Sequence, residues 1–193
     1  MSKYLLSEPV VIRQIKSMQY RAQAIPMVLI AVSFSLGLVF KHSYIFGSLS
    51  ILGLIWFLIV ASRHRFKNRI IKPENDNIYS PITGRVRDLK VSNGLRQITI
   101  HKGFMDQVEL RCPVTGAFWQ GDDLVVPQPK IRFTFQAQNL SRIPDSEMKS
   151  GNVIALITGK GNCLIHLAES IPILLNLNRY CEAGESRITL PNK

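Results

Sequence analysis

The sequence predicts a mainly β protein in which a transmembrane hairpin of two helices precedes a soluble β domain of a barrel or barrel-sandwich kind. Two nearly continuous apolar runs cover residues 26–40 and 44–61, and a bilayer core requires about 20 apolar residues for each spanning helix. After residue 72 the chain shows short stretches of strand-forming residues separated by turns, with no long helical period. This second pattern is typical of barrels and sandwiches.

Charge divides the 193 residues into two unlike parts. Residues 1–72 contain 10 Lys and Arg and a single acidic residue, Glu8, whereas residues 73–193 carry a net charge of only +2. The β domain also lacks the basic residues interleaved with aromatics that are typical of nucleic-acid binding. We therefore expect membrane phospholipids, and no nucleic acid, as partners.

Residues 1–24 are expected to form an amphipathic N-terminal segment. Its apolar residues recur at three and four positions between basic ones: Val11, Ile15, Met18 and Ala22. The spacing predicts a short helix over residues 9–22, suited to lie on an anionic membrane surface. A lead-in helix without lipid contact fits the same pattern.

The transmembrane hairpin is expected over residues 25–62. Basic residues cluster on both sides of it, at Lys3, Arg13, Lys16 and Arg21 and again at Arg63, Arg65, Lys67, Arg69 and Lys72. The connecting turn offers only Lys41 and the titratable His42. Because basic residues stay on the cytoplasmic side, both termini and the β domain are predicted to be cytoplasmic, at the plasma (inner) membrane.

A basic juxtamembrane segment and linker are expected over residues 63–77. Four of its cations are candidates for binding lipid headgroups: Arg63, Arg65, Lys67 and Arg69. Each cation near an anionic surface contributes on the order of 1 kcal/mol of attraction. A plain stop-transfer signal is the alternative interpretation. The polar stretch of residues 73–77, rich in turn formers, predicts a linker.

The β domain is expected over residues 78–193. Two similar segments frame it, each predicted to form a structural turn: Pro81-Ile82-Thr83-Gly84 and Pro113-Val114-Thr115-Gly116. Pro fixes φ at the first turn position, and Gly is expected to take the positive φ of a tight reversal. The offset of 32 residues suggests one supersecondary unit used twice.

Further strands follow from turn residues and alternation. A hairpin is predicted around Gly94, a half-buried strand over residues 131–135, and a second hairpin around residues 159–162. Residues 136–151 are polar and predicted to be loop, and residues 181–185 to form a last turn.

Metal and cofactor motifs are sparse. Neither His101 nor His166 has an acidic or thiol ligand at metal spacing, and the acidic pair Asp122-Asp123 lacks a facing pair for acid/base work. The Gly-Lys-Gly-Asn run at residues 159–162 lacks the P-loop spacing. The cysteines, Cys112, Cys163 and Cys181, fit neither a disulfide framework nor a zinc site. We expect no metal and no other cofactor.

The order of these features resembles the short, membrane-anchored type of phosphatidylserine decarboxylase. The chain shares a hydrophobic hairpin, a basic entry segment (residues 66–73), an S-P-x-x-G turn, a P-x-x-G turn and a terminal A-G-E turn. The resemblance implies a lipoyl-like β domain. It also implies self-cleavage at a Gly-Ser bond, with the serine becoming a pyruvoyl group that decarboxylates phosphatidylserine, assisted by an Asp and a His.

The residues that carry this chemistry in the family differ here. Thr83 stands where the family has its Asp, and Val108 where it has its His. Asp106, Arg111, Pro113 and Gly116 match, but the chain ends before the family's terminal Gly-Ser. Neither Thr nor Val is a general base near neutral pH. The resemblance thus implies a protein without catalytic residues.

Three functions stay open at this point. The first is a non-catalytic lipid-binding or scaffold subunit, partnering membrane phospholipids and either an active paralogue or other membrane subunits. The second is an active decarboxylase in phosphatidylethanolamine synthesis that uses displaced residues and a pyruvoyl group. The third is an adaptor subunit of a membrane transport or secretion complex, which rests on fold analogy.

Overall fold

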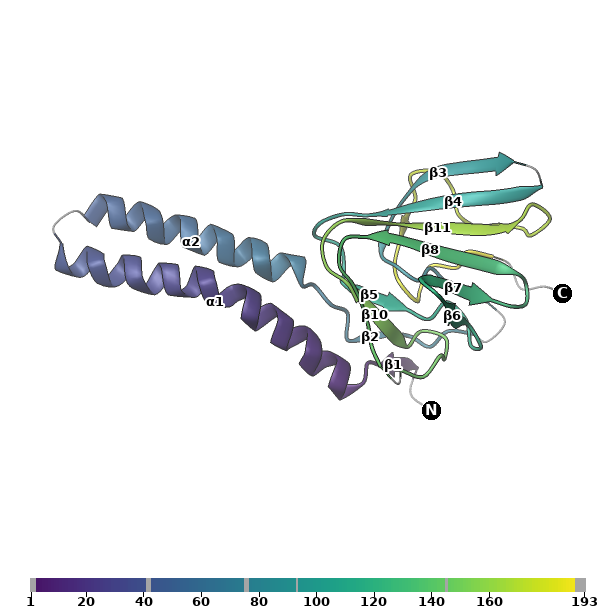
Figure 1. Ribbon diagram of the computed structural model, residues 1–193, viewed down its shortest axis with the longest axis horizontal. Helices are drawn as coiled ribbons and strands as arrows, with labels where there is room; N and C mark the ends of the chain where they lie inside the picture. The colour runs from purple at the N-terminus through teal and green to yellow at the C-terminus, as the bar shows by residue number, and fades with distance from the viewer. Residues whose placement is uncertain (1–2, 41–42, 75–76, 93, 145, 190–193) are drawn as a thin grey trace. The chain divides into compact units, whose positions relative to one another are not determined.

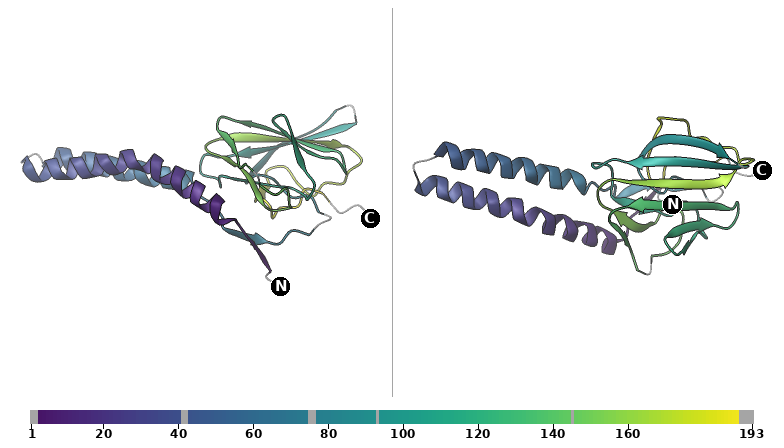
Figure 2. Two further views of the ribbon diagram at one scale, coloured as in Figure 1. Left: turned by 60° about the horizontal axis from the view of Figure 1, so that its bottom comes forward. Right: turned by 45° about the horizontal axis from the view of Figure 1, so that its top comes forward.

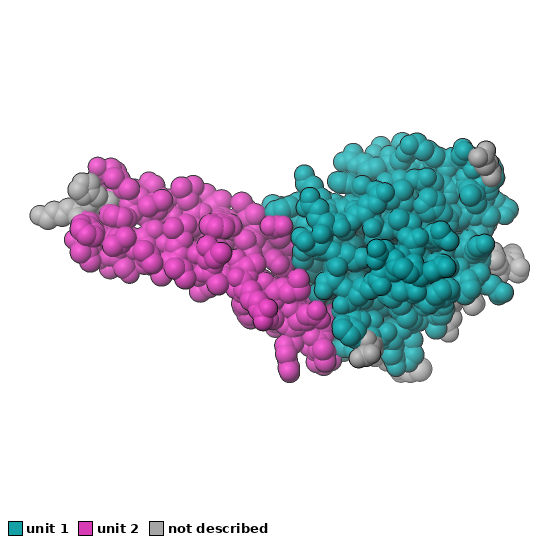
Figure 3. Space-filling model, in the orientation of Figure 1, with its two compact units in different colours: residues 1–8, 66–193 teal, residues 9–65 magenta. Residues whose placement is uncertain are grey.

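The computed structural model describes residues 3–40, 43–74, 77–92, 94–144 and 146–189. They form two compact units (Figure 3): a helical unit of residues 9–65 and a β unit that combines residues 1–8 with residues 66–193. The protein is mainly β with two apolar helices near the N-terminus, as the sequence predicts. Lys41 and His42, on which part of the topology prediction rests, lie outside the described residues.

The helical unit is a hairpin of α1 (Pro9–Val39) and α2 (Ser43–Arg63) (Figure 1). Both helices are long and apolar enough to cross a bilayer, with a mean hydropathy of 2.0 and 2.3 in their most apolar stretches. Only 17% and 11% of those stretches are buried inside the protein. A core helix of a soluble protein is mostly buried, so this exposure favours a lipid environment.

The expected short amphipathic helix is not a separate element. α1 runs through Pro26 without a break, so the predicted boundary between residues 24 and 25 falls inside it. Val11 and Ile15, on the expected apolar face, are only 2% and 3% exposed. Contact of this segment with a membrane surface stays a prediction.

The two helices approach each other closely at Gly53. A Cβ built there would lie 2.8 Å from Ile30 Cγ1 and 3.5 Å from the Pro26 carbonyl oxygen. Small residues allow such close approach between apolar helices, whose attraction comes from packing rather than from water exclusion.

We expect Gly53→Leu to weaken the hairpin by about 1–3 kcal/mol, because the added side chain has to push α1 away. The matched control is Gly47→Leu in the same helix, where a Cβ meets no atom within 4 Å. Loss of helical circular dichroism during an SDS titration measures the difference. Equal midpoints for the two variants would contradict the packing described here.

The β unit contains one large sheet, a smaller sheet and a two-stranded ribbon. Its strands are β1 (Tyr4–Leu6), β2 (Arg69–Ile71), β3 (Gly84–Ser92), β4 (Leu95–Lys102), β5 (Glu109–Arg111), β6 (Phe118–Gln120), β7 (Asp123–Val126), β8 (Ile131–Ala137), β9 (Leu140–Arg142), β10 (Val153–Ile157), β11 (Gly161–Ala168) and β12 (Tyr180–Cys181). The large sheet is antiparallel, in the order β12-β3-β4-β11-β8-β7-β6. Figure 2 shows it from two further sides. Among the described strands, the pairings do not close a barrel.

The smaller sheet has the order β5-β10-β9 and shares one core with the large sheet. Alternation places one face of each long strand inward, as in β8, where Ile131 and Phe133 are fully buried and Arg132 is exposed. β10 is buried along its whole length, because its five apolar residues lie in the middle of the smaller sheet.

Two strand predictions were wrong. β10 and β11 do not form a hairpin around residues 159–162, since β10 pairs with β5 and β9 whereas β11 pairs with β4 and β8. Five apolar residues in a row require burial on both faces, which an outer hairpin strand does not provide. The polar stretch 136–151 contains β9, which pairs with β10. Strands pair through backbone groups, so the polar side chains of this stretch gave no sign of a strand. The hairpin of β3 and β4 around Gly94 is confirmed by their pairing.

The N-terminal strand β1 pairs with β2, which follows the helices in the chain. Tyr4 pairs with Ile71 and Leu6 with Arg69, so the helical hairpin is an insertion between two strands of one ribbon. The stretch 63–77 is therefore more than a basic segment and linker. Ile70 is 1% exposed, and Asn77 is buried and hydrogen-bonded to Glu74 over 2.6 Å. Asn75 and Asp76 lie outside the described residues.

Candidate functional site

The two Pro-x-Thr-Gly segments lie side by side. The Tyr79 amide donates to the Pro113 carbonyl over 3.0 Å, and the Arg111 amide donates to the Pro81 carbonyl over 2.8 Å. The segments are not two copies of one turn, however. Gly116 has a φ of +88°, as expected, but Gly84 has no positive φ. Gly84 is required for space instead, because a Cβ there would collide with the backbone carbonyl of His101.

Thr83 lies at the centre of this junction and is fully buried. Its hydroxyl donates to the Gln107 side-chain oxygen over 3.0 Å and accepts from the Ala183 amide over 3.1 Å. Val108, the neighbour of Gln107, is 1% exposed. Three segments that are distant in the chain thus meet at the Thr83 hydroxyl, through the Gln107 carboxamide and the Ala183 amide. None of these groups takes up or releases a proton near neutral pH.

The last turn of the chain closes over the same junction. The Ser80 amide donates to the Ser186 carbonyl over 2.8 Å, and the Gly184 amide donates to the Ser80 carbonyl over 2.8 Å. The Ser186 hydroxyl accepts from the Glu182 amide over 2.9 Å. The expected turn over residues 181–185 is confirmed, with Gly184 at a φ of +72°. Beside it opens a groove of about 540 Å³, lined by Tyr180, Glu182 and Arg187 among others.

A buried ion pair lies next to this junction. Glu109 and Arg111 belong to β5 and are both 1% exposed, with 3.7 Å between the Glu109 Oε1 and an Arg111 terminal nitrogen. Arg111 also donates to the Gly151 carbonyl over 2.8 Å and to the Lys67 carbonyl over 2.6 Å. Glu109 Oε1 accepts from the Lys67 amide over 3.2 Å. The pair therefore holds the backbone at Lys67, the residue that leads into β2.

Burial governs the ionisation of this pair. It raises the pKa of Glu109, an effect that the nearby Arg111 charge partly offsets. It also lowers the pKa of Arg111, against the attraction of Glu109. Taking two charges out of water costs several kcal/mol per ion, and only good partners recover that cost. Such a pair adds little net stability compared with apolar residues, but removing one partner alone is costly.

The Lys67 side chain forms a second, more exposed clamp. Its ammonium lies 2.7 Å from Glu182 Oε2 and 2.8 Å from Glu185 Oε2. Burial opposes the charge on Lys67, but the hydrogen bonds to the two glutamates outweigh it and raise the Lys67 pKa. The hydrogen bond from Lys67 lowers the pKa of Glu182. The clamp joins the segment entering β2 to the last turn of the chain.

We expect this clamp to weaken in acid. A lowered carboxyl pKa adds stability above the ordinary value of 4.5, and that stability is lost as pH falls through the lowered value. The difference between pH 6 and pH 3 should be less than about 1 kcal/mol, since the side chains are one-fifth to two-fifths exposed.

Denaturant midpoints of the wild type and of Glu182→Gln, taken at both pH values, test this expectation. Glu109, with its raised pKa, changes stability in the opposite sense, and comparing the two proteins subtracts its effect. The same pH dependence in both proteins would show that the clamp contributes nothing.

The predicted headgroup ligands have different surroundings. Arg63 ends α2, Arg65 is exposed just after it, and Arg69 is exposed in β2. Lys67 is engaged by two glutamates, so its charge is largely neutralised. Headgroup binding by these residues stays a prediction. Arg65 and Arg69, which are exposed, are better placed for it than Lys67.

The other polar candidates have ordinary structural partners. The His101 ring nitrogen lies 2.8 Å from the Asn162 side-chain oxygen, and Asp122 pairs with Arg142 over 2.8 Å. His166 lies in β11, which pairs with β4 and with β8. Within the described ranges, no group of three or more His, Cys, Asp or Glu is placed to hold a metal ion.

All three cysteines are free and buried. Burial raises the pKa of Cys112 to about 11 and that of Cys181 to about 11. Burial also raises the pKa of Cys163. A thiol with so high a pKa is a poor nucleophile at neutral pH, because the thiolate is the reactive form.

Sequence reasoning missed the ion pair and the clamp. Glu109, Leu110 and Arg111 are consecutive and all buried, whereas a strand with one solvated face would expose the charged positions. The available signal was a charged pair two residues apart between the apolar residues Val108 and Cys112. No sequence spacing relates Lys67 to Glu182 and Glu185, which are more than 100 residues away.

No protein-family model, no curated protein and no solved structure matches this chain.

Proposed function

We propose that this protein is a membrane-anchored, non-catalytic protein of the phosphatidylserine decarboxylase type, whose β domain acts as a lipid-binding or scaffold subunit. In this proposal the two sheets form a variant of the barrel-sandwich, lipoyl-like domain. The helices anchor it in the plasma (inner) membrane with the termini and the β domain in the cytoplasm. Its partners are membrane phospholipids and either an active paralogue or another membrane subunit.

One observation carries the proposal. The resemblance places an Asp at position 83 and a His at position 108, and Thr83 lies against Gln107, the chain neighbour of Val108, and against the last turn. There the Thr83 hydroxyl is fully buried and engaged by Gln107 and Ala183. Self-cleavage requires a group that removes a proton from the attacking serine, and Thr83 and Val108 supply none. Gly184 is followed by Glu185, so the terminal turn also lacks the Gly-Ser bond.

Two features support a membrane anchor: the two exposed apolar helices and the cations that flank them. Arg63, Arg65 and Arg69 follow the second helix, where attraction to anionic lipid is strongest within about a Debye length of the surface. A β domain held there without catalytic groups is suited to present a binding surface rather than to turn over a substrate.

Intact mass spectrometry of the full chain, purified from membranes, tests the proposal. We expect a single uncut chain of 21.8 kDa whose mass borohydride leaves unchanged. Two fragments, one carrying a reducible pyruvoyl mass, would overturn it and favour the active enzyme. Conversion of labelled phosphatidylserine by the purified protein would do the same.

A further inference from the structure

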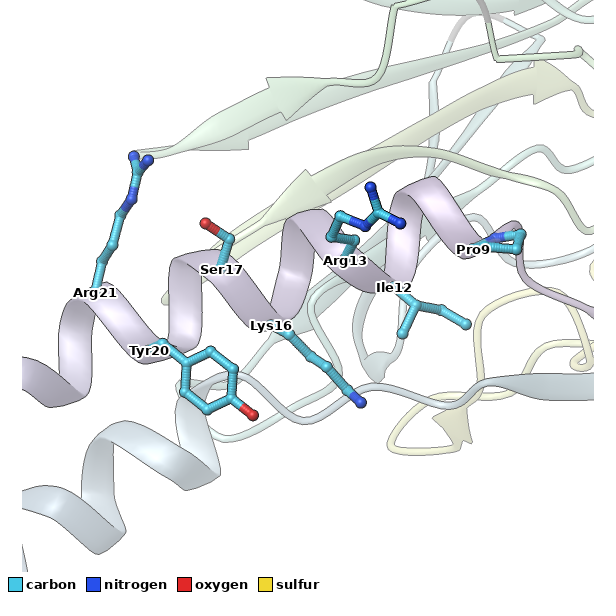
Figure 4. Close-up of a pocket in the computed structure, with 7 residues that line it drawn as sticks. All are labelled: Pro9, Ile12, Arg13, Lys16, Ser17, Tyr20 and Arg21. Atoms are coloured by element: carbon cyan, nitrogen blue, oxygen red, sulfur yellow. The ribbon is translucent and has the colours of Figure 1, made fainter.

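One face of the N-terminal half of α1 forms an open, cationic groove. It has a volume of about 570 Å³ and runs from Pro9 to Arg21, and its polar lining includes Arg13, Lys16 and Tyr20 (Figure 4). These side chains recur at three and four positions, so they share one side of the helix. The opposite side carries Val11 and Ile15, which are buried.

The charge of the groove is uncompensated. α1 contains no Asp or Glu, and in the part of the chain that the structure describes Arg13, Lys16 and Arg21 form no ion pair. Exposed basic side chains without acidic neighbours attract an anion, and a tyrosine hydroxyl beside them adds a hydrogen-bond donor. The groove therefore fits the phosphate of an anionic ligand.

The same face of α1 continues as an exposed apolar stripe. Met27, Phe34 and Leu38 follow Tyr20 at steps of seven, seven and four residues, which is helical spacing along one side. They are 57%, 64% and 75% exposed. A cationic groove in line with an apolar stripe matches a ligand that is anionic at one end and apolar along the rest. Free phosphate and a nucleic acid have no such apolar part.

The length of α1 sets the depth of the groove in a bilayer. A span of about 20 residues ending at Val39 begins at Tyr20, since each residue advances about 1.5 Å and the hydrocarbon core is about 30 Å thick. Lys16 and Arg13 then lie about 6 and 10 Å beyond that boundary, among the headgroups. Tyrosine is enriched at this interface, and arginine and lysine extend toward it.

We propose that this groove is a binding site for the headgroup phosphate of an anionic phospholipid, with one acyl chain lying along the stripe of Met27, Phe34 and Leu38. Arg13 and Lys16 bind the phosphate, Tyr20 donates to its ester oxygen, and Arg21 adds its positive charge at the end of the groove. The inference rests on the proposed membrane function and deepens it by locating lipid recognition in α1 rather than after α2.

Native mass spectrometry of the full-length protein in mild detergent, titrated with phosphatidylglycerol and with phosphatidylcholine, tests the site. The variant is Arg13→Gln, Lys16→Gln and Arg21→Gln together. The first control, Arg87→Gln, Lys130→Gln and Arg132→Gln, removes the same charge from exposed positions of the β unit. The second control, Arg63→Gln, Arg65→Gln and Arg69→Gln, removes the cations that follow α2.

We expect the α1 variant to bind phosphatidylglycerol about a hundredfold more weakly, at roughly fivefold for each cation removed. Phosphatidylcholine binding and the first control should change by less than about threefold. The second control should lose less affinity than the α1 variant, because its cations attract anionic lipid without lining the groove. Met27→Asn should also weaken phosphatidylglycerol binding, which a plain surface charge effect would not produce.

The contrary outcomes separate the two proposals. Loss of binding only in the second control would overturn the α1 site and leave the proposed lipid-binding function standing. If glycerol phosphate at the same concentration as the lipid competes for the site, the ligand is a soluble phosphate compound and not a lipid. If the wild type shows no preference for phosphatidylglycerol over phosphatidylcholine, both the α1 site and the proposed lipid-binding function are overturned. The intact-mass measurement tests the non-catalytic assignment independently of this result.

Discussion

Arg111→Met is expected to destabilise the β domain by about 3–5 kcal/mol. The substitution leaves Glu109 buried and without its counter-charge, which is the costly way to break an ion pair. It also removes the donors to the carbonyls of Gly151 and Lys67. Since whole domains are stable by only about 5–15 kcal/mol, this single change should bring the domain close to unfolding.

Denaturant unfolding followed by Trp119 fluorescence measures this loss. Trp119 packs against Phe135 in the β unit, and a Trp56→Phe background removes the other tryptophan. Arg187→Met is the matched control, because Arg187 pairs with Glu74 at the surface and should contribute less than about 1 kcal/mol.

Two further variants keep the result interpretable if Arg111→Met fails to fold. The double change Glu109→Leu and Arg111→Met should recover much of the stability, since it removes the uncompensated charge. Arg111→Lys should fall between the wild type and Arg111→Met. A loss in Arg111→Met no larger than in Arg187→Met would contradict the role assigned to the pair.

Gly84→Ala is expected to cost about 3 kcal/mol or more. The new Cβ would collide with the His101 carbonyl oxygen and lie 3.1 Å from Ile100 Cγ2. Both belong to β4, the neighbour of β3 in the large sheet. Because the colliding atom is backbone, relief requires the strands to separate, and such overpacking is among the more damaging core changes.

Gly116→Ala is the matched comparison for Gly84→Ala. Gly116 has positive φ but open space around its Cα, so only the conformational cost of about 1–2 kcal/mol applies. The same fluorescence titration compares the two. Equal losses of unfolding free energy in the two variants would mean that Gly84 and Gly116 are required for the same reason. Two copies of one repeated turn would give that result.

The sequence was sufficient for the features that depend on local pattern. The apolar runs predicted both helices, and alternation with turn residues predicted β3, β4 and β8. Patterns of this kind indicate which residues are buried and where turns occur within a few neighbouring residues. The lengths of β4 and β11, eight residues each, follow from pairing with strands that are distant in the chain, and local pattern carries no such information.

The misses share one cause, which is tertiary pairing. β10 reads as a hairpin partner of β11, yet its continuous burial places it in another sheet. Thr83 was singled out as a position lacking a carboxylate, but its partners Gln107 and Ala183 are 24 and 100 residues away. Lys67 was assigned to lipid as one cation in a run, because sequence alone does not show the glutamates that meet it.

The ribbon of β1 and β2 has a consequence for how the chain enters a bilayer. Residues 4–6 and 69–71 share a ladder of backbone pairs, so the two ends of the helical hairpin have to be on the same side of any membrane that it crosses. This constraint is independent of where the basic residues lie. It also orders assembly: the first strand leaves the ribosome early, but its partner is made only after both helices have been synthesised. The ribbon therefore forms only after the whole hairpin has been synthesised.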